Sequence, residues 1–165
     1  MGITLEQLLD SRDKRAERQR ELQKQFPGSA LVCLTVQLPG SEKRNRTSLL
    51  IGGAGLSALL NKFGSVLKHV QVQDLETGYE AYLMVSLPAS LVKRMTVELE
   101  EKHPLGRLMD MDVIGPDGPV SRESAGFGPR KCLLCDNEVR YCMRAHTHTQ
   151  AELLCKIEQM VDGYV

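Results

Sequence analysis

The sequence predicts an α+β fold with a ferredoxin-like βαββαβ core, in which helices cover one face of an antiparallel sheet. Three observations lead to this prediction. Between residues 30 and 114 the apolar patterns follow the order strand, helix, strand, strand, helix, strand, which is the order of a split βαβ unit. The two middle strands are separated only by Glu76-Thr77-Gly78, which is typical of a hairpin turn. Both helical segments of this region are amphipathic, so each needs a sheet face on which to bury its apolar side.

Each element has a local signal of its own. The expected elements are, in chain order, a helix over 4–25, a strand over 30–38, a helix over 47–63, strands over 66–75 and 79–87, a helix over 88–102, a strand over 107–114 and a final helix over 150–161. Capping boxes formed by Thr4 with Gln7 and by Thr149 with Glu152 mark the starts of the first and last helices.

The chain length fits one domain over residues 1–165. Within it we expect an N-terminal helix over 1–27, an α/β core over 30–114, and a cysteine-rich loop with a C-terminal helix over 115–165. The helix over 47–63 contains Gly52-Gly53-Ala54-Gly55, which is unusual because glycine weakens a helix interior. Close packing of another backbone is the favoured explanation, and a loop whose amides face an anion is the alternative.

The composition excludes several classes of protein. Twenty-one basic side chains balance 21 acidic ones, and only 4% of residues are aromatic, so we expect no nucleic-acid partner. No apolar run approaches the roughly 20 residues of a membrane span, and the first ten residues lack the pattern of a signal peptide. We therefore expect a cytoplasmic protein with no membrane partner. Its five cysteines should be reduced thiols or metal ligands.

The segment from Arg107 to Ile114 carries the most specific chemical signal. It places Asp110 and Asp112 two residues apart in a pattern that otherwise resembles a buried strand. Side chains at i and i+2 of a strand point to the same face, roughly 7 Å apart. Two neighbouring carboxylates repel each other unless a cation or a proton relieves them, and Mg²⁺ binds one or two carboxylates together with substrate phosphates. A solvated strand face is the alternative, because Asp-x-Asp is short and common.

Basic residues near this strand are candidates for phosphate contacts. Arg107 opens this segment and carries a guanidinium fork that matches phosphate oxygens. On the first helix, Arg12 and Arg15 fall near the apolar stripe, where each would either snorkel to solvent or face a ligand. The loop beyond residue 121 adds Arg122 and Arg130.

A cysteine cluster lies in the C-terminal part of the chain. Cys132 and Cys135 form a Cys-x-x-Cys pair, and Cys142 and His148 follow within reach. Zinc needs four nitrogen or sulfur ligands, and such a pair supplies two of them from one turn. Reduced cysteines that pack the loop against the core are the alternative, because a second Cys-x-x-Cys pair is missing.

Three groups of residues together resemble the apo-citrate lyase phosphoribosyl-dephospho-CoA transferase family, also called holo-citrate lyase acyl-carrier-protein synthase. The central group is His103-Pro104-Leu105-Gly106-Arg107-Leu108-x-Asp110-x-Asp112-Val113. The others are Arg130-x-Cys132-Leu133-Leu134-Cys135, followed by Cys142, Arg144 and Thr147-His148, and the N-terminal Leu8-Leu9-x-Ser11-Arg12-Asp13-x-Arg15 with Arg18-Gln19. The likeness covers nearly the whole chain in the family's order.

The resemblance implies a specific reaction. Enzymes of this family move a phosphoribosyl-dephospho-CoA group from triphosphoribosyl-dephospho-CoA to a serine of the citrate lyase acyl carrier protein, and pyrophosphate leaves. It implies that Asp110 and Asp112 hold Mg²⁺, that one of them helps to deprotonate the serine, and that Arg107 binds a phosphate oxygen. The expected substrate-binding residues are Arg12, Arg15, Gly106, Arg122 and Arg130.

Two other functions are compatible with the residues. A non-catalytic ferredoxin-like adaptor with a structural zinc would explain the cysteines and the balanced charge, but it leaves the cost of Asp110 and Asp112 unexplained. A nucleotidyltransferase with another acceptor, either a small molecule or tRNA, is the second alternative. The absence of a basic excess argues against tRNA.

Overall fold

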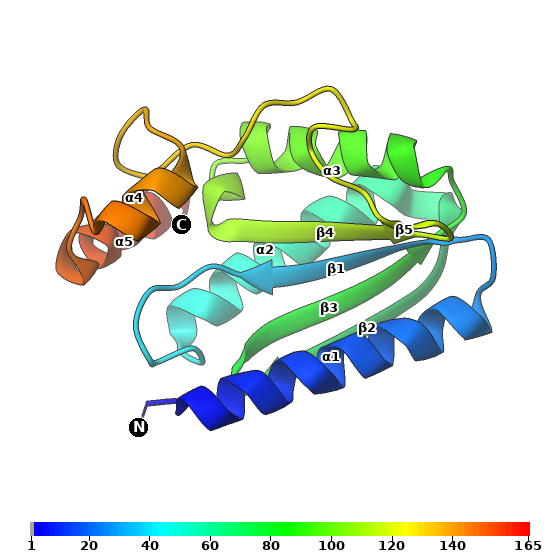
Figure 1. The fold of residues 1–165 in the computed structure, drawn as a ribbon, viewed down its shortest axis with the longest axis horizontal. Helices are drawn as coiled ribbons and strands as arrows, with labels where there is room; N and C mark the ends of the chain where they lie inside the picture. The colour runs from blue at the N-terminus through cyan, green and yellow to red at the C-terminus, as the bar shows by residue number, and fades with distance from the viewer. Residues whose placement is uncertain (1) are drawn as a thin grey trace.

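A five-stranded antiparallel sheet in the order β2-β3-β1-β4-β5 organises the protein (Figure 1). The structure is a computed structural model that describes residues 2–165, so Met1 of the expected N-terminal segment lies outside the described residues. The strands are β1 (Ala30–Val36), β2 (Leu67–Leu75), β3 (Gly78–Val85), β4 (Met109–Gly115) and β5 (Gly118–Pro119). The α-helices are α1 (Leu5–Gln25), α2 (Arg46–Phe63), α3 (Ala89–Lys102), α4 (Val139–Ala145) and α5 (Gln150–Tyr164), and short 3-10 turns cover Gly64–Val66 and Gly106–Leu108.

Helices cover both faces of the sheet. Helices α2 and α3 pack on one face, where the larger hydrophobic core gathers residues such as Val32, Leu34 and Met111. Helix α1 crosses the opposite face and closes a smaller cluster around Leu22 and Tyr82. Because side chains alternate along a strand, each central strand contributes to both clusters.

The predicted α+β fold with a ferredoxin-like core is confirmed. The core elements occur in the expected order, and the split topology places β3 between β1 and β2, and β1 between β3 and β4. Both predicted capping boxes are present, at Thr4 with Gln7 and at Thr149 with Glu152. Helix α4 and the two-residue strand β5 were not predicted, because a seven-residue helix and a two-residue strand are too short to show a period.

Two glycines of α2 are closely packed, but against side chains of the sheet and not against another backbone as expected. A Cβ on Gly52 would lie 2.4 Å from the ring of Tyr79 on β3, and one on Gly55 would lie 3.0 Å from Leu34. A Cβ on Gly53 would meet open space. Helix α2 therefore approaches the sheet more closely than a helix with side chains at Gly52 and Gly55 could.

The same helix corrects the expectation that no apolar run approaches the length of a membrane span. The segment Arg46–Val66 has 21 residues and a mean hydropathy of 1.3, so its length and composition alone would allow it to cross a membrane. Core helices of soluble proteins meet the same criterion. Here α2 buries Ile51, Leu59 and Phe63 against the rest of the protein.

Candidate functional site: an aspartate pair beside the first helix

The two aspartates lie on the face of β4 that is turned toward α1. Residues Met109, Met111 and Val113 of β4 are buried in the core on the opposite side, so Asp110 and Asp112 project from the other face. On the neighbouring strand β1, Asp110 is paired with Thr35 and Asp112 with Cys33. The structure thus places both carboxylates side by side on one strand face, as the spacing predicts.

The two carboxylates have different surroundings. Gln37 donates a hydrogen bond from Nε2 to Asp110 Oδ2 (3.0 Å), and Arg130 Nη1 lies 3.9 Å from Asp110 Oδ1. Asp112 is solvent-exposed along part of its side chain, yet desolvation by the surrounding protein and the nearby Asp110 carboxylate raise its pKa to about 6. Lys93 and Arg15 act in the opposite direction but do not cancel this effect. The pair therefore favours binding of a proton or a cation.

Helix α1 places Arg15 over the same sheet face. Arg15 Nε donates to Glu80 Oε2 on β3 (3.1 Å), and Glu80 also accepts a hydrogen bond from the buried Tyr82 hydroxyl (2.6 Å). The buried Cys33 thiol lies between this group and Asp112, and its pKa is raised to about 12, chiefly by desolvation. Cys33 is therefore a packed, protonated thiol and not a nucleophile.

Arg12 is exposed, and its place follows from the helix period. Gln23 of α1 donates to Gly115 O at the end of β4 (3.3 Å), which shows that this flank of the helix faces β4. Arg12 precedes Gln23 by 11 residues, or about three turns, and so lies on the same flank. Arg12 thus lies on the β4 side of α1, whereas Arg15 is held over the middle of the sheet by Glu80.

Arg107 lies before β4, in the 3-10 turn Gly106–Leu108, and not on the strand as the pattern predicted. Its Nε atom is buried and has no hydrogen-bond partner among residues 2–165. Desolvation, and then the nearby Arg130 guanidinium, lower the pKa of Arg107. It lines a pocket of about 220 Å³ with Glu101, Arg130, Lys131 and residues 127–129. Three cations against one carboxylate make this pocket suited to an anion.

Arg130 joins that pocket to the aspartates. Its Nη2 donates to the carbonyl oxygens of Gly106 (3.2 Å), Arg107 (2.8 Å) and Met109 (2.6 Å). Its Nη1 lies between Glu100 and Asp110, at 3.7 and 3.9 Å. The guanidinium therefore fixes the backbone that leads into β4 and contacts the aspartate face.

The other two predicted substrate-binding residues, Arg122 and Gly106, lie against the end of α3. Arg122 donates to Glu100 (2.9 Å) and Glu101 (3.0 Å) on α3. Gly106 has no room for a side chain, because a Cβ there would lie 2.2 Å from Glu100 O. Arg122 therefore ties the loop after β5 to the end of α3, and Gly106 lets the turn that carries Arg107 pack on the same helix end.

Backbone hydrogen-bonding groups on the outer edge of β4 find their partners in side chains that the sequence did not predict. The Met111 amide donates to Glu100 Oε2 (2.8 Å), and its carbonyl accepts from Lys93 Nζ (3.2 Å). These charged groups replace a neighbouring strand along this stretch of the edge. Glu80 and Gln37 were not predicted either. A signal was available for Glu80, because it is the one charged residue in the otherwise apolar run of β3.

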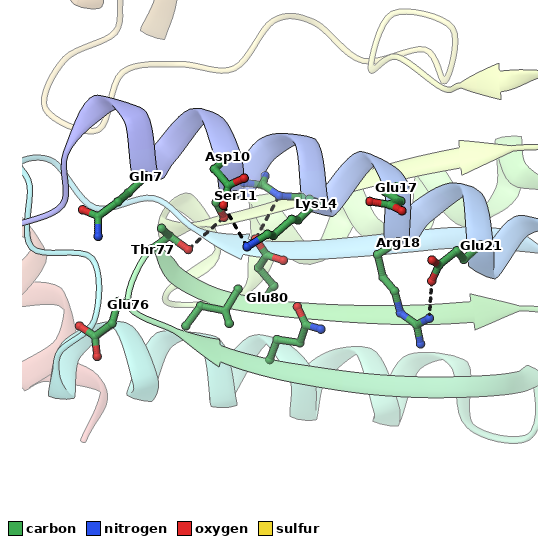
Figure 2. A pocket seen from close by; sticks show the side chains of 13 residues that line it. Gln7, Asp10, Ser11, Lys14, Glu17, Arg18, Glu21, Glu76, Thr77 and Glu80 are labelled. Atoms are coloured by element: carbon green, nitrogen blue, oxygen red, sulfur yellow. Dashed lines mark hydrogen bonds and ion pairs between the residues drawn. The ribbon is translucent and has the colours of Figure 1, made fainter.

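A larger pocket of about 580 Å³ lies along the other flank of α1, beside β2 and β3 (Figure 2). Ser11 and Thr77 hydrogen-bond across it (2.9 Å), and Arg18 pairs with Glu21 (2.9 Å). Its charged lining residues are Asp10, Lys14, Arg15, Glu17, Arg18, Glu21, Glu76 and Glu80. Five carboxylates against three cations do not favour a triphosphate here.

The four predicted zinc ligands come together around α4, outside the sheet. The ligand atoms of Cys132, Cys135, Cys142 and His148 all lie within 4.8 Å of one another, so the cluster could hold a metal ion. Burial alone would raise the pKa of Cys132, but amide hydrogen bonds from Leu134 and Cys135 outweigh it and lower the pKa to about 7.

The fold and site define an α+β protein with a paired-carboxylate face, a cationic pocket beside it and a separate Cys/His cluster. A family model described as apo-citrate lyase phosphoribosyl-dephospho-CoA transferase matches residues 3–164. A protein of Vibrio cholerae serotype O1 named "Probable apo-citrate lyase phosphoribosyl-dephospho-CoA transferase" is 38% identical over 169 residues, covering 99% of this chain and 94% of that protein. An Escherichia coli protein named "Apo-citrate lyase phosphoribosyl-dephospho-CoA transferase" is 37% identical over 165 residues, covering 98% and 90%. The chain belongs to this family of transferases, which confirms the resemblance drawn from its motifs.

Proposed function

We propose that this protein transfers the phosphoribosyl-dephospho-CoA group from triphosphoribosyl-dephospho-CoA to a serine of the citrate lyase acyl carrier protein. Family membership supports the reaction class. The observation that carries the assignment to this site is the contact of Arg130 with both the aspartate face and the pocket of Arg107, whose buried Nε has no hydrogen-bond partner among residues 2–165. A carboxylate pair beside an anion pocket is what transfer from a triphosphate requires.

Mg²⁺ is part of the proposal, and the residues fit it. Asp110 and Asp112 supply the one or two carboxylates that Mg²⁺ takes in phosphate-transfer sites, while substrate phosphates complete the ligands. Desolvation, and then the neighbouring Asp110 carboxylate, raise the pKa of Asp112, and a cation bound between the two would offset their repulsion. When bound, the ion would offset charge on the triphosphate and orient it.

The chain's own residues account for the remaining steps. The serine hydroxyl oxygen attacks the phosphorus next to the ribose, the bond from that phosphorus to the leaving pyrophosphate oxygen breaks, and a phosphodiester forms. An aspartate of the pair accepts the hydroxyl proton, and Asp112, whose pKa is raised to about 6, is suited to this role. Arg107 binds the pyrophosphate as charge builds on it, with Lys131 and Arg130 beside it.

The proposal includes the remaining contacts of the substrate. Arg12 and Arg15 approach it from α1, whereas Arg122 ties the loop after β5 to α3 and Gly106 lets the turn that carries Arg107 pack on that helix. The partners are the carrier protein and the triphosphate precursor, with no nucleic acid or membrane, in the cytoplasm. The Cys/His cluster has no part in the chemical step.

The test is to incubate the purified protein with apo carrier protein, triphosphoribosyl-dephospho-CoA and Mg²⁺, and to measure the intact mass of the carrier. We expect a gain equal to the prosthetic group that disappears when Mg²⁺ is omitted by dialysis. Dialysis is preferred to a chelator because it leaves the Cys/His cluster undisturbed. A carrier whose acceptor serine is changed to alanine is the matched control. An unchanged mass, with a carrier that a known synthase does modify, would overturn the proposal.

A further inference from the structure

The Cys/His cluster is built from two local structures that lie outside the sheet, and Leu133, between its first two cysteines, packs against the main core. Cys132 and Cys135 lie in a small hairpin, in which the Cys132 amide donates to Asn137 O (2.7 Å) and the Val139 amide donates to Arg130 O (2.9 Å). The Leu134 amide approaches Cys132 Sγ at 3.5 Å. Amides directed at the first sulfur of a Cys-x-x-Cys turn stabilise it as a thiolate, which is the form that binds metal.

The other two ligands come from α4 and the turn that ends it. Cys142 is on α4, and His146 terminates this helix in the left-handed conformation (φ 51°, ψ 44°). That turn reverses the chain and brings His148 back, so that its Nε2 lies 3.4 Å from Cys135 Sγ. Cys135 and Cys142 have their sulfur atoms 3.4 Å apart.

The donor set favours zinc over a disulfide between two of the cysteines. Tetrahedral zinc with Zn–S bonds of about 2.3 Å places its sulfur ligands about 3.8 Å apart, which agrees with four donors mutually within 4.8 Å. A disulfide would use two of the cysteines and leave the convergence of the third cysteine and the histidine without a cause. Three thiolates and one imidazole leave no open position, which is typical of a structural site rather than a catalytic one.

The segment over residues 120–138, which carries the first two cysteines, has little packing of its own to order it. Between β5 and α4 the chain forms no helix or strand longer than an isolated bridge within residues 120–138. Within this segment Ala125 and Cys132 are the buried side chains, and Cys142 is the buried residue of the following helix α4. A segment with so little apolar burial gains order when a metal joins its parts.

Arg130 connects this cluster to the aspartate face. It precedes Cys132 by two residues, its carbonyl belongs to the cysteine hairpin, and its guanidinium binds the backbone entering β4 and contacts Asp110. We propose that Cys132, Cys135, Cys142 and His148 bind one structural zinc ion, which holds Arg130 as a positioning residue against the start of β4. The zinc site is independent of the proposed function; only its effect on transfer depends on it.

The first measurement is the zinc content of the protein purified without chelators, by inductively coupled plasma mass spectrometry. We expect one zinc per chain, released when the thiols are modified by a mercurial reagent. If the metal is lost in purification, the reduced protein should take up one equivalent of added zinc. Failure to bind zinc stoichiometrically in either form overturns the site.

Variants test the ligand set. Cys135→Ser and His148→Ala should lose zinc and melt at a lower temperature, whereas His148→Cys should retain zinc because it preserves four ligands. Cys155→Ser is the matched control, because Cys155 is exposed on α5 outside the cluster. Retention of zinc by Cys135→Ser, or its loss from Cys155→Ser, contradicts the assignment.

The role of Arg130 is tested separately on zinc-loaded protein. Arg130→Ala should keep its zinc but lose amide hydrogen-exchange protection at the start of β4, and transfer should fall. Removal of zinc from the wild type should lower the same protection. If zinc removal leaves β4 unchanged, the positioning role is wrong while the metal site stands, and neither result depends on detecting transfer.

Discussion

The two faces of the same sheet differ in what they bury. On the side of α2 and α3, β1, β3 and β4 contribute an uninterrupted apolar surface that includes Leu34, Leu83 and Met111. On the side of α1, the same strands carry Glu80, Asp110 and Asp112 beside a small apolar cluster. The comparison teaches that one face supplies folding energy and the other tolerates charges that cost stability, which is expected where chemistry takes place.

The largest expected effect comes from the charged face. Asp110→Asn and Asp112→Asn should each reduce transfer at least about 100-fold, because each removes a charge that would hold Mg²⁺ or accept the serine proton. Intact mass of the carrier protein over time measures the rate, and circular dichroism checks that the fold is kept. Full activity in both variants would remove the argument for a metal site.

A substitution of Met111, which lies between the two aspartates, should lower stability and leave the transfer rate unchanged. Met111 is fully buried on the apolar face, so Met111→Ala should lower the free energy of unfolding by about 2–5 kcal/mol. Urea denaturation measures this loss, and the transfer rate per folded molecule should remain near that of the wild type. A rate loss as large as that of Asp110→Asn would show that the two faces are not separable.

The approach of α2 to the apolar face can be tested with neighbouring glycines. Gly52→Ala should destabilise the protein by about 1–3 kcal/mol, because its Cβ would overlap the Tyr79 ring. Gly53→Ala is the matched control one residue away; it meets open space and should stabilise α2 by about 0.5–1 kcal/mol. Thermal unfolding of the two variants should shift in opposite directions, and equal shifts would contradict the close packing.

The smallest effect concerns the pH dependence of stability. The pKa of Asp112 is raised to about 6 by desolvation and by Asp110, whereas in the unfolded chain it is about 3.9. The folded protein therefore binds the proton more tightly, and the charged side chain costs stability as pH rises from about 4 through 6. Without Mg²⁺, Asp112→Asn should be more stable than the wild type above pH 6, by about 1 kcal/mol because water screens the exposed carboxylate. Urea midpoints that differ equally at pH 4 and pH 7 would exclude this cause.

The sequence by itself determined the order of the elements and the alternation of β4. Local signals were sufficient there, because the capping boxes, Pro-Gly breaks and apolar periods act within a few residues. The i, i+2 spacing also placed Asp110 and Asp112 on one face, since strand geometry needs no information from the rest of the chain. Spacing likewise selected the four residues of the Cys/His cluster, which the structure brings together.

Only the tertiary structure decided which groups meet across the sheet. Arg15 pairs with Glu80, 65 residues away, and Arg130 reaches carbonyls more than 20 residues before it. Arg107 was predicted on the strand but lies in a tight turn before it, because Gly106 packs directly on the end of α3. Contacts of this kind depend on how separate elements pack, and no local period encodes a pairing between residues distant in the chain.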